Sequence, residues 1–468
     1  MKHTFLIKTF LFIILPILGF SQQDSILTLN INDAQQYAIK NNLNLKNASL
    51  DVDAAEKKVW ETTAIGLPQI NGTLNYQHIP GELPTFDFGA DSSTIELYNY
   101  IFASLDMLSD NAGVTLPVMP DMDSGDGEPL TLGVKNSTTY SVTVSQLVFS
   151  GEYLVGLQAS KTYLQISKLN MENQEIDLKA DVLNNYISIL ILENNLNIIE
   201  SSVTNMESLV NETKKMSEQG FMESTDADQL QISLNTLINA RNTIKRQIDV
   251  SYMLFKITLG ADLNSNIKLS QDINSVYDHI INKKVSDDFD INNNINFKMI
   301  ENQVKISELS LKREKTKYLP TISAFYNYQD KTNKASFDFT INHIIGVNLD
   351  VPIFSSFQRN AVVQQAKIEY KKSINNQMLL EDNLKAQAQL LRYNFINALE
   401  KYEVTQQNVD LSKNVFENTS KKYKQGMVSS MDLTQANNVY LQAESDNTNA
   451  LMTLLQTKIE LEKILNEL

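Results

Sequence analysis

Side chains that could act in catalysis are few in this sequence and lie far apart. Beyond His3, the histidines are His78, His279 and His343, and none belongs to a His-Glu-x-x-His zinc motif. The chain has no cysteine, which excludes a disulfide framework and a thiolate metal site. It contains no phosphate-binding glycine loop, and no carboxylates are spaced as a general acid–base pair. We therefore predict that the protein is not an enzyme and holds no cofactor or metal.

Two aspartates occupy equivalent places in the sequence, since each lies six residues after a glycine. The pairs are Gly220 with Asp226 and Gly426 with Asp432. An aspartate at a helix start accepts backbone N–H bonds and suits the helix dipole, so capping alone explains both residues. A second role for these carboxylates is left open beside it.

Apolar side chains follow both glycines, where contact with water would be expected. They are Phe221-Met222 and Met427-Val428, the second followed by Ser429. Methionine adapts to varied partner surfaces, so these residues suit docking to another protein. The alternative is that they pack across the turns within an assembly.

Long helices must position these turns. Residues 157–219 and 357–425 contain neither Gly nor Pro, and each stretch predicts a helix about 100 Å long. A C-cap glycine followed closely by Ser/Thr and Asp predicts tight turns at 217–226 and 423–432. The returning helices, 226–259 and 432–467, are about half as long, and helices at 33–66 and 294–318 have suitable lengths to cover the remainder.

The sequence contains an internal twofold repeat. Asn41 to Lys46 and Leu67-Pro68 recur 252 residues later, at Asn293 to Lys298 and Leu319-Pro320. The residues before Gly220 recur 206 residues later, before Gly426. The predicted organisation is a first repeat at 22–262, a connector at 263–292 and a second repeat at 293–468. The extra residues of the first repeat fall between about residues 78 and 136 and predict a long acidic loop.

Four segments change from helical to alternating periodicity, which predicts half-buried strands. Two lie after Pro68 and before Phe149, and their counterparts lie at 320–331 and 337–353. A strand of about 9–11 residues can span a bilayer when tilted, with apolar side chains outward and polar ones toward a lumen. Aromatic residues that suit the membrane boundaries, or ordinary strand packing, are Tyr76, Tyr140, Tyr326, Tyr328 and Phe339.

The first 21 residues have the features of a signal peptide: lysines, a short apolar run and a small-x-small cleavage pattern. The apolar run is too short to span a membrane as a helix, and no later stretch is long enough. The formal net charge is −15, so binding to nucleic acid is not expected. These features predict an exported protein.

Four strands cannot close a barrel in lipid, where open edges leave N–H and C=O groups without partners. Two copies could close a small barrel and three would give twelve strands; the pattern alone does not choose. The twofold repeat, the order helix, strand, strand, long helix, turn and helix in each half, and the turn from Tyr423 to Leu433 resemble the TolC-like outer membrane efflux proteins.

The resemblance covers essentially all of the chain after residue 21. It implies a mainly helical homotrimer with a twelve-stranded barrel in outer membrane lipid and a periplasmic tunnel. It also implies an efflux or type I secretion role with a periplasmic adaptor and an inner-membrane pump. The residues implied for adaptor docking are Gly220, Phe221, Met222, Gly426, Met427, Val428 and Ser429, and those implied for pore constriction are Asp226, Tyr423 and Asp432. A family carboxylate is replaced by Gln435, and a family arginine by Val428.

Two other interpretations have observable consequences. A coiled-coil scaffold, periplasmic or on the surface, would explain the helices but not the four strands. The acidic segment Asp121 to Glu128 resembles a calcium loop but lacks the regular ligand spacing of an EF-hand, so a solvated external loop is the expectation for residues 80–134.

Overall fold

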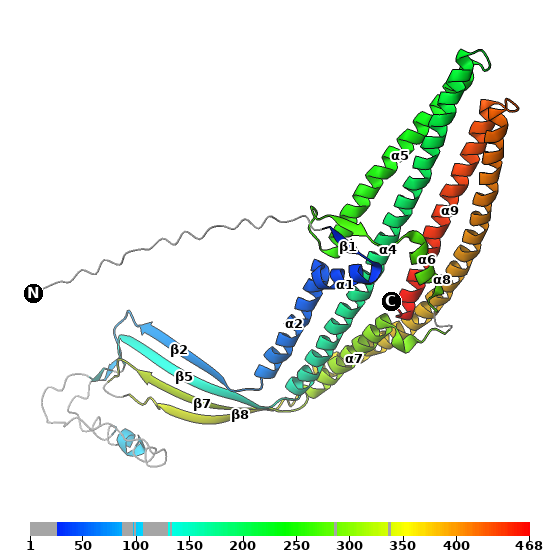
Figure 1. Ribbon diagram of the computed structural model, residues 1–468. Helices are drawn as coiled ribbons and strands as arrows, with labels where there is room; N and C mark the ends of the chain where they lie inside the picture. Colours follow the sequence, from blue (N-terminus) through cyan, green and yellow to red (C-terminus); the bar gives the residue numbers. More distant parts are fainter. Residues whose placement is uncertain are drawn as a thin grey trace, which may run out of the picture. The chain divides into compact units, whose positions relative to one another are not determined.

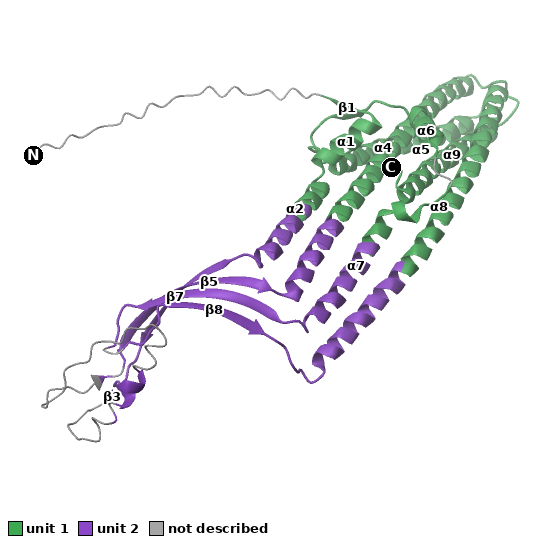
Figure 2. Ribbon diagram, turned by 90° about the horizontal axis from the view of Figure 1, so that it is seen from below, with its two compact units in different colours: residues 1–51, 168–300, 378–468 green, residues 52–167, 301–377 purple. Residues whose placement is uncertain are grey.

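The computed structural model (Figure 1) describes residues 26–86, 97, 100–105, 130–131, 133–284, 288–335 and 338–468. The predicted signal peptide and the acidic segment 121–128 lie outside the described residues. The chain divides into two compact units, and each takes residues from both sequence repeats (Figure 2). Unit 1 comprises residues 26–51, 168–300 and 378–468, and unit 2 comprises 52–167 and 301–377.

Helices make up most of the described chain. No described helix is both long and apolar enough to cross a membrane. The helices are α1 (Ile31–Asn41), α2 (Leu43–Ala64), α4 (Gly151–Glu218), α5 (Ser224–Leu259), α6 (Ile273–Asn282), η1 (Ile291–Asn293), α7 (Ile295–Thr316), α8 (Gln358–Lys424) and α9 (Ser430–Leu465). The strands are β1 (Leu27–Leu29), β2 (Gln69–His78), β3 (Thr85–Phe86), β4 (Leu130–Thr131), β5 (Asn136–Phe149), β6 (Ile267–Leu269), β7 (Thr321–Lys331) and β8 (His343–Asp350).

The two long helices are present as predicted, with 68 residues in α4 and 67 in α8. The returning helices α5 and α9 have 36 residues each. The single helix predicted at 33–66 is wrong, because α1 and α2 are separate helices on either side of Asn42. The Asn42 side chain accepts hydrogen bonds from the backbone N–H groups of Asn44 and Leu45, so it caps a new helix there.

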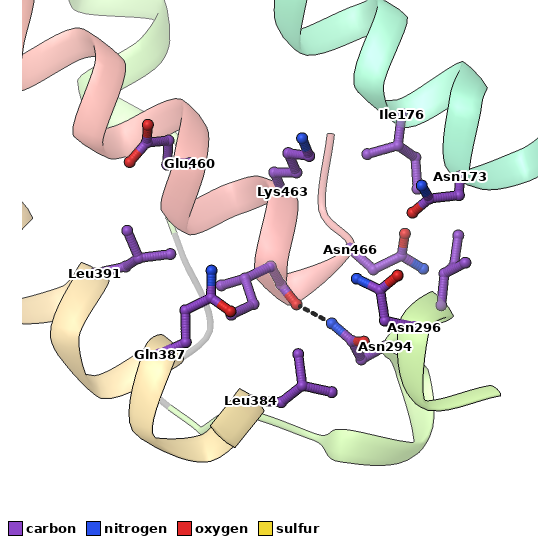
Figure 3. A pocket seen from close by; sticks show the side chains of 12 residues that line it. Asn173, Ile176, Asn294, Asn296, Leu384, Gln387, Leu391, Glu460, Lys463 and Asn466 are labelled. Atoms are coloured by element: carbon purple, nitrogen blue, oxygen red, sulfur yellow. Dashed lines mark hydrogen bonds between the residues drawn. The ribbon is translucent and has the colours of Figure 1, made fainter. Parts of the chain in front are cut away.

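The Asn42 cap has an equivalent in the second repeat. Asn42 Nδ2 donates to the Thr258 carbonyl at 2.9 Å, and Asn294 Nδ2 donates to the Ile464 carbonyl at 2.9 Å. These two bonds are related by the same offsets, 252 and 206, that relate the sequence halves. Asn294 lines a cavity of about 290 Å³ in unit 1 (Figure 3), whose other amide side chains are Asn173, Asn296, Gln387 and Asn466.

Unit 1 has an apolar core that joins its helices to a small sheet. The connector between the repeats contains β6 and α6, which the sequence did not predict. Strand β6 pairs in parallel with β1, and α6 begins at the Asp272 cap, where the side chain accepts from Ser275 N. The largest side chains of the core near this sheet are fully buried, as in Tyr186 and Phe255. Their burial holds the connector onto α4 and α5.

Unit 2 is built on an antiparallel sheet in the order β2-β5-β7-β8. The helices that adjoin these strands, α2, α4, α7 and α8, follow the same order (Figure 2). β8 is shorter than the predicted strand at 337–353. It ends before Pro352, which has no N–H to donate to a ladder, and the Asp338 side chain forms a turn by accepting from Thr340 N before β8 begins. Phe339 therefore lies outside the strands.

The extra residues of the first repeat are not wholly a loop. Strand β2 extends to His78 and β5 begins at Asn136, so both strands reach the limits predicted for the insertion. Within it, β3 and β4 form a short antiparallel pair.

Candidate functional site

Both helical hairpins of unit 1 turn at a glycine in the left-handed conformation. Gly220 has φ of 78° and Gly426 has φ of 70°, values that residues with a Cβ rarely adopt. The Phe221 N–H donates to the Met216 carbonyl at 2.9 Å, and the Met427 N–H donates to the Lys422 carbonyl at 3.0 Å. Each turn thus satisfies a carbonyl left free at the helix end, which fixes the direction in which the next residues point.

The apolar residues of the turns separate into two groups. Phe221 and Met427 are exposed, at 78% and 69% of their surface. Met222 and Val428 instead pack against the buried cluster between the hairpins. Of the predicted docking residues, only the exposed group and the exposed Gly220, Gly426 and Ser429 are available to a partner in this structure.

Asp432 acts as a helix cap. Its carboxylate accepts from the Ser429 N–H at 3.0 Å and from the Ser429 hydroxyl, and the Asp432 N–H donates back to Ser429 Oγ at 3.2 Å. This reciprocal pair is a capping box at the start of α9. The hydrogen bonds from Ser429 hold the pKa of the Asp432 carboxyl below its usual value, so it stays ionised near neutral pH. The Asp432 side chain is exposed, so its negative charge is accessible to solvent and to ions.

Asp226 occupies the position equivalent to Asp432 but makes different contacts. The residue before α5 is Glu223, which makes no side-chain cap, and the Asp226 carboxylate accepts from the Ser430 hydroxyl of the other hairpin. Gln229 also contacts Ser430, with its Oε1 at 3.2 Å. Ser430 is almost fully buried, so this contact ties the start of α5 to the start of α9.

Tyr423 forms the second tie between the hairpins. Its side chain is 3% exposed, and its hydroxyl lies 3.0 Å from the Thr213 hydroxyl and 3.7 Å from Met222 Sδ. Burial raises the pKa of the Tyr423 hydroxyl, and the Asp226 charge adds to the rise, while the Thr213 hydrogen bond opposes it. The structure therefore brings Asp226 and Tyr423 to one hairpin interface, without a hydrogen bond between them, and leaves Asp432 at its surface.

The partners Ser430 and Thr213 were missed at the sequence level. They lie 204 and 210 residues from Asp226 and Tyr423, so no local spacing reveals them. One feature of the sequence could have indicated a contact at Ser430: it is a small polar residue at the first position of the helix, directly after the cap Ser429.

The sheet of unit 2 has two chemically different faces, because successive side chains alternate and paired residues share a face. One face is apolar and exposed, with Ile345 at 82% and Val347 at 68%. Its aromatic members include Tyr76, Tyr140, Tyr326 and Tyr328. The other face carries mainly uncharged polar residues, among them Asn71, Thr73, Asn75, Ser141, Thr143, Ser323, Asn327 and Asn348.

Hydrogen-bond contacts on the polar face join neighbouring strands. Thr73 Oγ1 lies 2.7 Å from Ser141 Oγ, and Asn327 Nδ2 donates to Thr143 Oγ1 at 2.7 Å. The strands β2 and β8 are the two edges of the sheet. On their outer sides, these two edge strands have no strand partner in the described part of the chain.

The histidines do not form a metal site in the described part of the chain. His78 Nδ1 lies 2.7 Å from Asn136 Oδ1, and His343 Nδ1 lies 2.8 Å from the Tyr326 hydroxyl. His279 is on α6 in the other unit. Among the described residues, no group of three His, Cys, Asp or Glu side chains could hold a metal ion.

Residues 291–467 match the family model of the outer membrane efflux protein. No curated protein matches the sequence. The fold is similar to that of VceC, an outer membrane protein from Vibrio cholerae, with a TM-score of 0.70 at 12% identity over 93% of this chain and 95% of that chain.

Two further solved structures share this fold. The Campylobacter jejuni CmeC outer membrane channel has a TM-score of 0.70 at 15% identity, covering 94% of this chain and 86% of that chain. The open state of the Neisseria gonorrhoeae MtrE outer membrane channel has a TM-score of 0.66 at 13% identity, covering 93% of this chain and 88% of that chain.

Proposed function

We propose that this chain is a subunit of an outer membrane efflux channel, because residues 291–467 match the family model of the outer membrane efflux protein. The observation that carries the proposal is the four-stranded sheet of unit 2. It has an apolar face for lipid, a mainly polar face for a water-filled lumen, and two open edges that need further copies of the chain. A homotrimer with twelve strands is the assembly proposed, in the outer membrane, with the helical hairpins in the periplasm.

The proposed cargo route joins this channel to an inner-membrane pump through a periplasmic adaptor, in an efflux or type I secretion system. The adaptor would dock on the hairpin turns, where Phe221 and Met427 present exposed apolar side chains on rigid glycine turns. Gly220, Gly426 and Ser429 would shape this surface, and Met222 and Val428 would support it from within. The channel passes its substrate without transforming it.

The proposed constriction lies at the same end of the hairpins. Asp226 with Ser430 and Tyr423 with Thr213 would hold the two hairpins of each chain together in a closed state. Asp432 would contribute one exposed carboxylate per copy to a ring at the pore entrance, where fixed negative charge attracts cations.

Replacing Asp432 with asparagine is expected to weaken block of the channel by divalent cations. Three ionised carboxylates close together bind a divalent cation more strongly than three amides do, because the attraction scales with their charge. Single-channel current would be recorded at neutral pH while the Mg²⁺ concentration is raised. Asp228→Asn on the exposed surface of α5 serves as the control for loss of one charge per copy. Unchanged block in Asp432→Asn would remove Asp432 from the constriction.

Membrane fractionation tests the function as a whole. We expect the protein to require detergent to leave the outer membrane, to migrate as a heat-modifiable oligomer and to conduct ions in a planar bilayer. A non-conducting coiled-coil scaffold would be released by osmotic shock and would give no conductance. That result would overturn the channel proposal.

A further inference from the structure

The two hairpins of the unit 2 sheet are copies of one another in their strand register. Gln69 pairs with Ser145 in the first hairpin, and Thr321 pairs with Asp350 in the second. The first strands differ by 252 residues and the second strands by 205. The flanking sequences repeat with the same offsets, since Leu67-Pro68 recurs as Leu319-Pro320 and Phe149-Ser150 as Phe354-Ser355. The equivalence of β2 with β7 and of β5 with β8 is thus fixed residue by residue.

The pairing of β5 with β7 is the junction between these two equivalent hairpins. Strand β8 corresponds to β5, but in one chain it has no strand on its outer side. Strand β2 corresponds to β7 and is the open edge on the other side. We propose that β8 of one copy pairs with β2 of the next copy in the register that β5 and β7 use within the chain. This inference rests on the proposed function, because only a closed barrel needs the pairing.

The internal junction then specifies the pairs between copies. Thr143 pairs with Asn327 within the chain, which places Asn348 opposite Asn75 of the next copy. The same translation gives the remaining central pairs: Val347 with Tyr76, Leu349 with Leu74, Gly346 with Gln77, Ile345 with His78 and Asp350 with Thr73. Each pair joins two residues of the same face, so the apolar and polar faces continue across the boundary. A slip of one residue would place apolar side chains of β8 on the polar side of β2.

Exposed apolar residues mark the same boundary where the strands meet the helices. Phe354 and Phe357 follow β8 and are 75% and 76% exposed, and Leu67 precedes β2 and is 43% exposed. At the internal junction the equivalent positions are in contact. A Cβ on Gly151 would lie 2.8 Å from Thr316 and 3.0 Å from Leu319, so the two segments approach closely there.

The sequence offsets of 205 and 252 identify the residues that would make the equivalent contact between two copies. Gly151 corresponds to Ser356, Thr316 to Ala64 and Leu319 to Leu67. The segment 353–357 of one copy is therefore assigned to cover residues 64–67 of the next, which removes Phe354 and Leu67 from water. This burial adds an apolar contact to the strand pairing.

Residues 352–357, which follow β8, have a fixed conformation. Ser356 and Phe357 both have positive φ, at 50° and 63°, which is unfavourable for residues with a Cβ. Arg359 stabilises the segment by donating from Nε to Ser355 Oγ at 2.9 Å and from Nη1 to the Pro352 carbonyl at 2.8 Å. Its guanidinium also lies over the Tyr318 ring, 5.3 Å from the centroid. A strained segment that keeps two phenylalanine rings exposed in one chain fits a surface completed by a second copy.

Disulfide trapping tests the register directly, because the natural chain contains no cysteine. The Asn348→Cys, Asn75→Cys double variant places both thiols on the lumen face, where an oxidant reaches them. The shifted controls are Asn348→Cys with Thr73→Cys and Asn348→Cys with Gln77→Cys, which stay on that face but move about 7 Å along the strand. A disulfide within one chain is excluded, since three strand spacings, about 14 Å, separate the edges and a disulfide spans under about 7 Å between Cα atoms.

The expected result is that most chains of the Asn348/Asn75 variant join into covalent oligomers, and only a small minority do so in either shifted variant. Preferential crosslinking of a shifted pair overturns the register. The absence of crosslinks in all three variants, in a protein that still forms a conducting heat-modifiable oligomer, overturns the pairing and leaves the channel proposal standing. If the unmodified chain forms no such oligomer and no conductance, the channel proposal itself fails.

Discussion

Replacing Val347 with lysine is expected to abolish assembly in the outer membrane, whereas the same change at the adjacent Asn348 is expected to be tolerated. Val347 lies on the apolar face of β8 and is 68% exposed in a single chain. A lysine on the lipid side of a barrel costs about 2–4 kcal/mol at the bilayer midplane, and every copy carries one. Lysine at Asn348 would instead point into the water-filled lumen and retain its hydration.

The amount of heat-modifiable oligomer in the membrane fraction measures this difference. Val347→Lys should leave little oligomer, and Asn348→Lys should give nearly the natural amount. In bilayer recordings, Asn348→Lys should also shift the ion preference toward anions, because it adds positive charge to the lumen wall. Equal assembly of the two variants would show that the faces of the sheet do not meet lipid and water as proposed.

Replacing Tyr423 with alanine is expected to loosen the two hairpins of unit 1 where they turn. The side chain is almost fully buried between them, and removing a large buried aromatic costs about 3–5 kcal/mol. If the hairpins close the pore, the variant channel should show a larger resting conductance. Hydrogen exchange of the amides near the turns should accelerate by roughly a hundredfold or more, since local opening becomes that much more favourable.

A double-mutant cycle separates packing from hydrogen bonding at this position. Tyr423→Phe keeps the ring and removes the hydroxyl with its contacts to the Thr213 hydroxyl and Met222 Sδ, so the expected cost is about 1–3 kcal/mol. Thr213→Val added to Tyr423→Phe should recover part of that loss, because no buried hydroxyl is then left without its partner. If Tyr423→Ala neither speeds exchange nor changes conductance, Tyr423 does not hold the hairpins together.

The helices and strands were predictable because they depend on local sequence. Residues 157–219 and 357–425 contain no Gly or Pro, and a glycine follows each stretch, so local sequence alone specifies long helices that end in tight turns. The alternation in β2, β5 and β7 similarly predicts half-buried strands. Strand β8 came out shorter than predicted because residues 338–342 alternate but form a turn at Asp338, so periodicity alone placed the strand's start too early.

The features that sequence did not predict depend on contacts between distant residues. Asn42 breaks a helix because its side chain can both cap α2 and reach the Thr258 carbonyl, 216 residues away. The short strand β6 forms because β1 lies beside it, and three residues carry too little periodicity to be recognised. At the hairpin turns, the resemblance pointed to Asp226 and Tyr423, but their partners Ser430 and Thr213 emerge only from the packing of one hairpin on the other.

The most direct test of a multimeric channel lined by the polar face of the sheet is thiol modification during single-channel recording. Ser141→Cys places a small thiol on the polar face of β5, and Val142→Cys places one on the apolar face of the next residue. A charged, water-soluble thiol reagent should reduce the current of the Ser141→Cys channel in three equal steps, one for each copy, and should leave the Val142→Cys channel unchanged. Modification that alters the Val142→Cys current and spares Ser141→Cys, or a protein that conducts no current, would contradict the account.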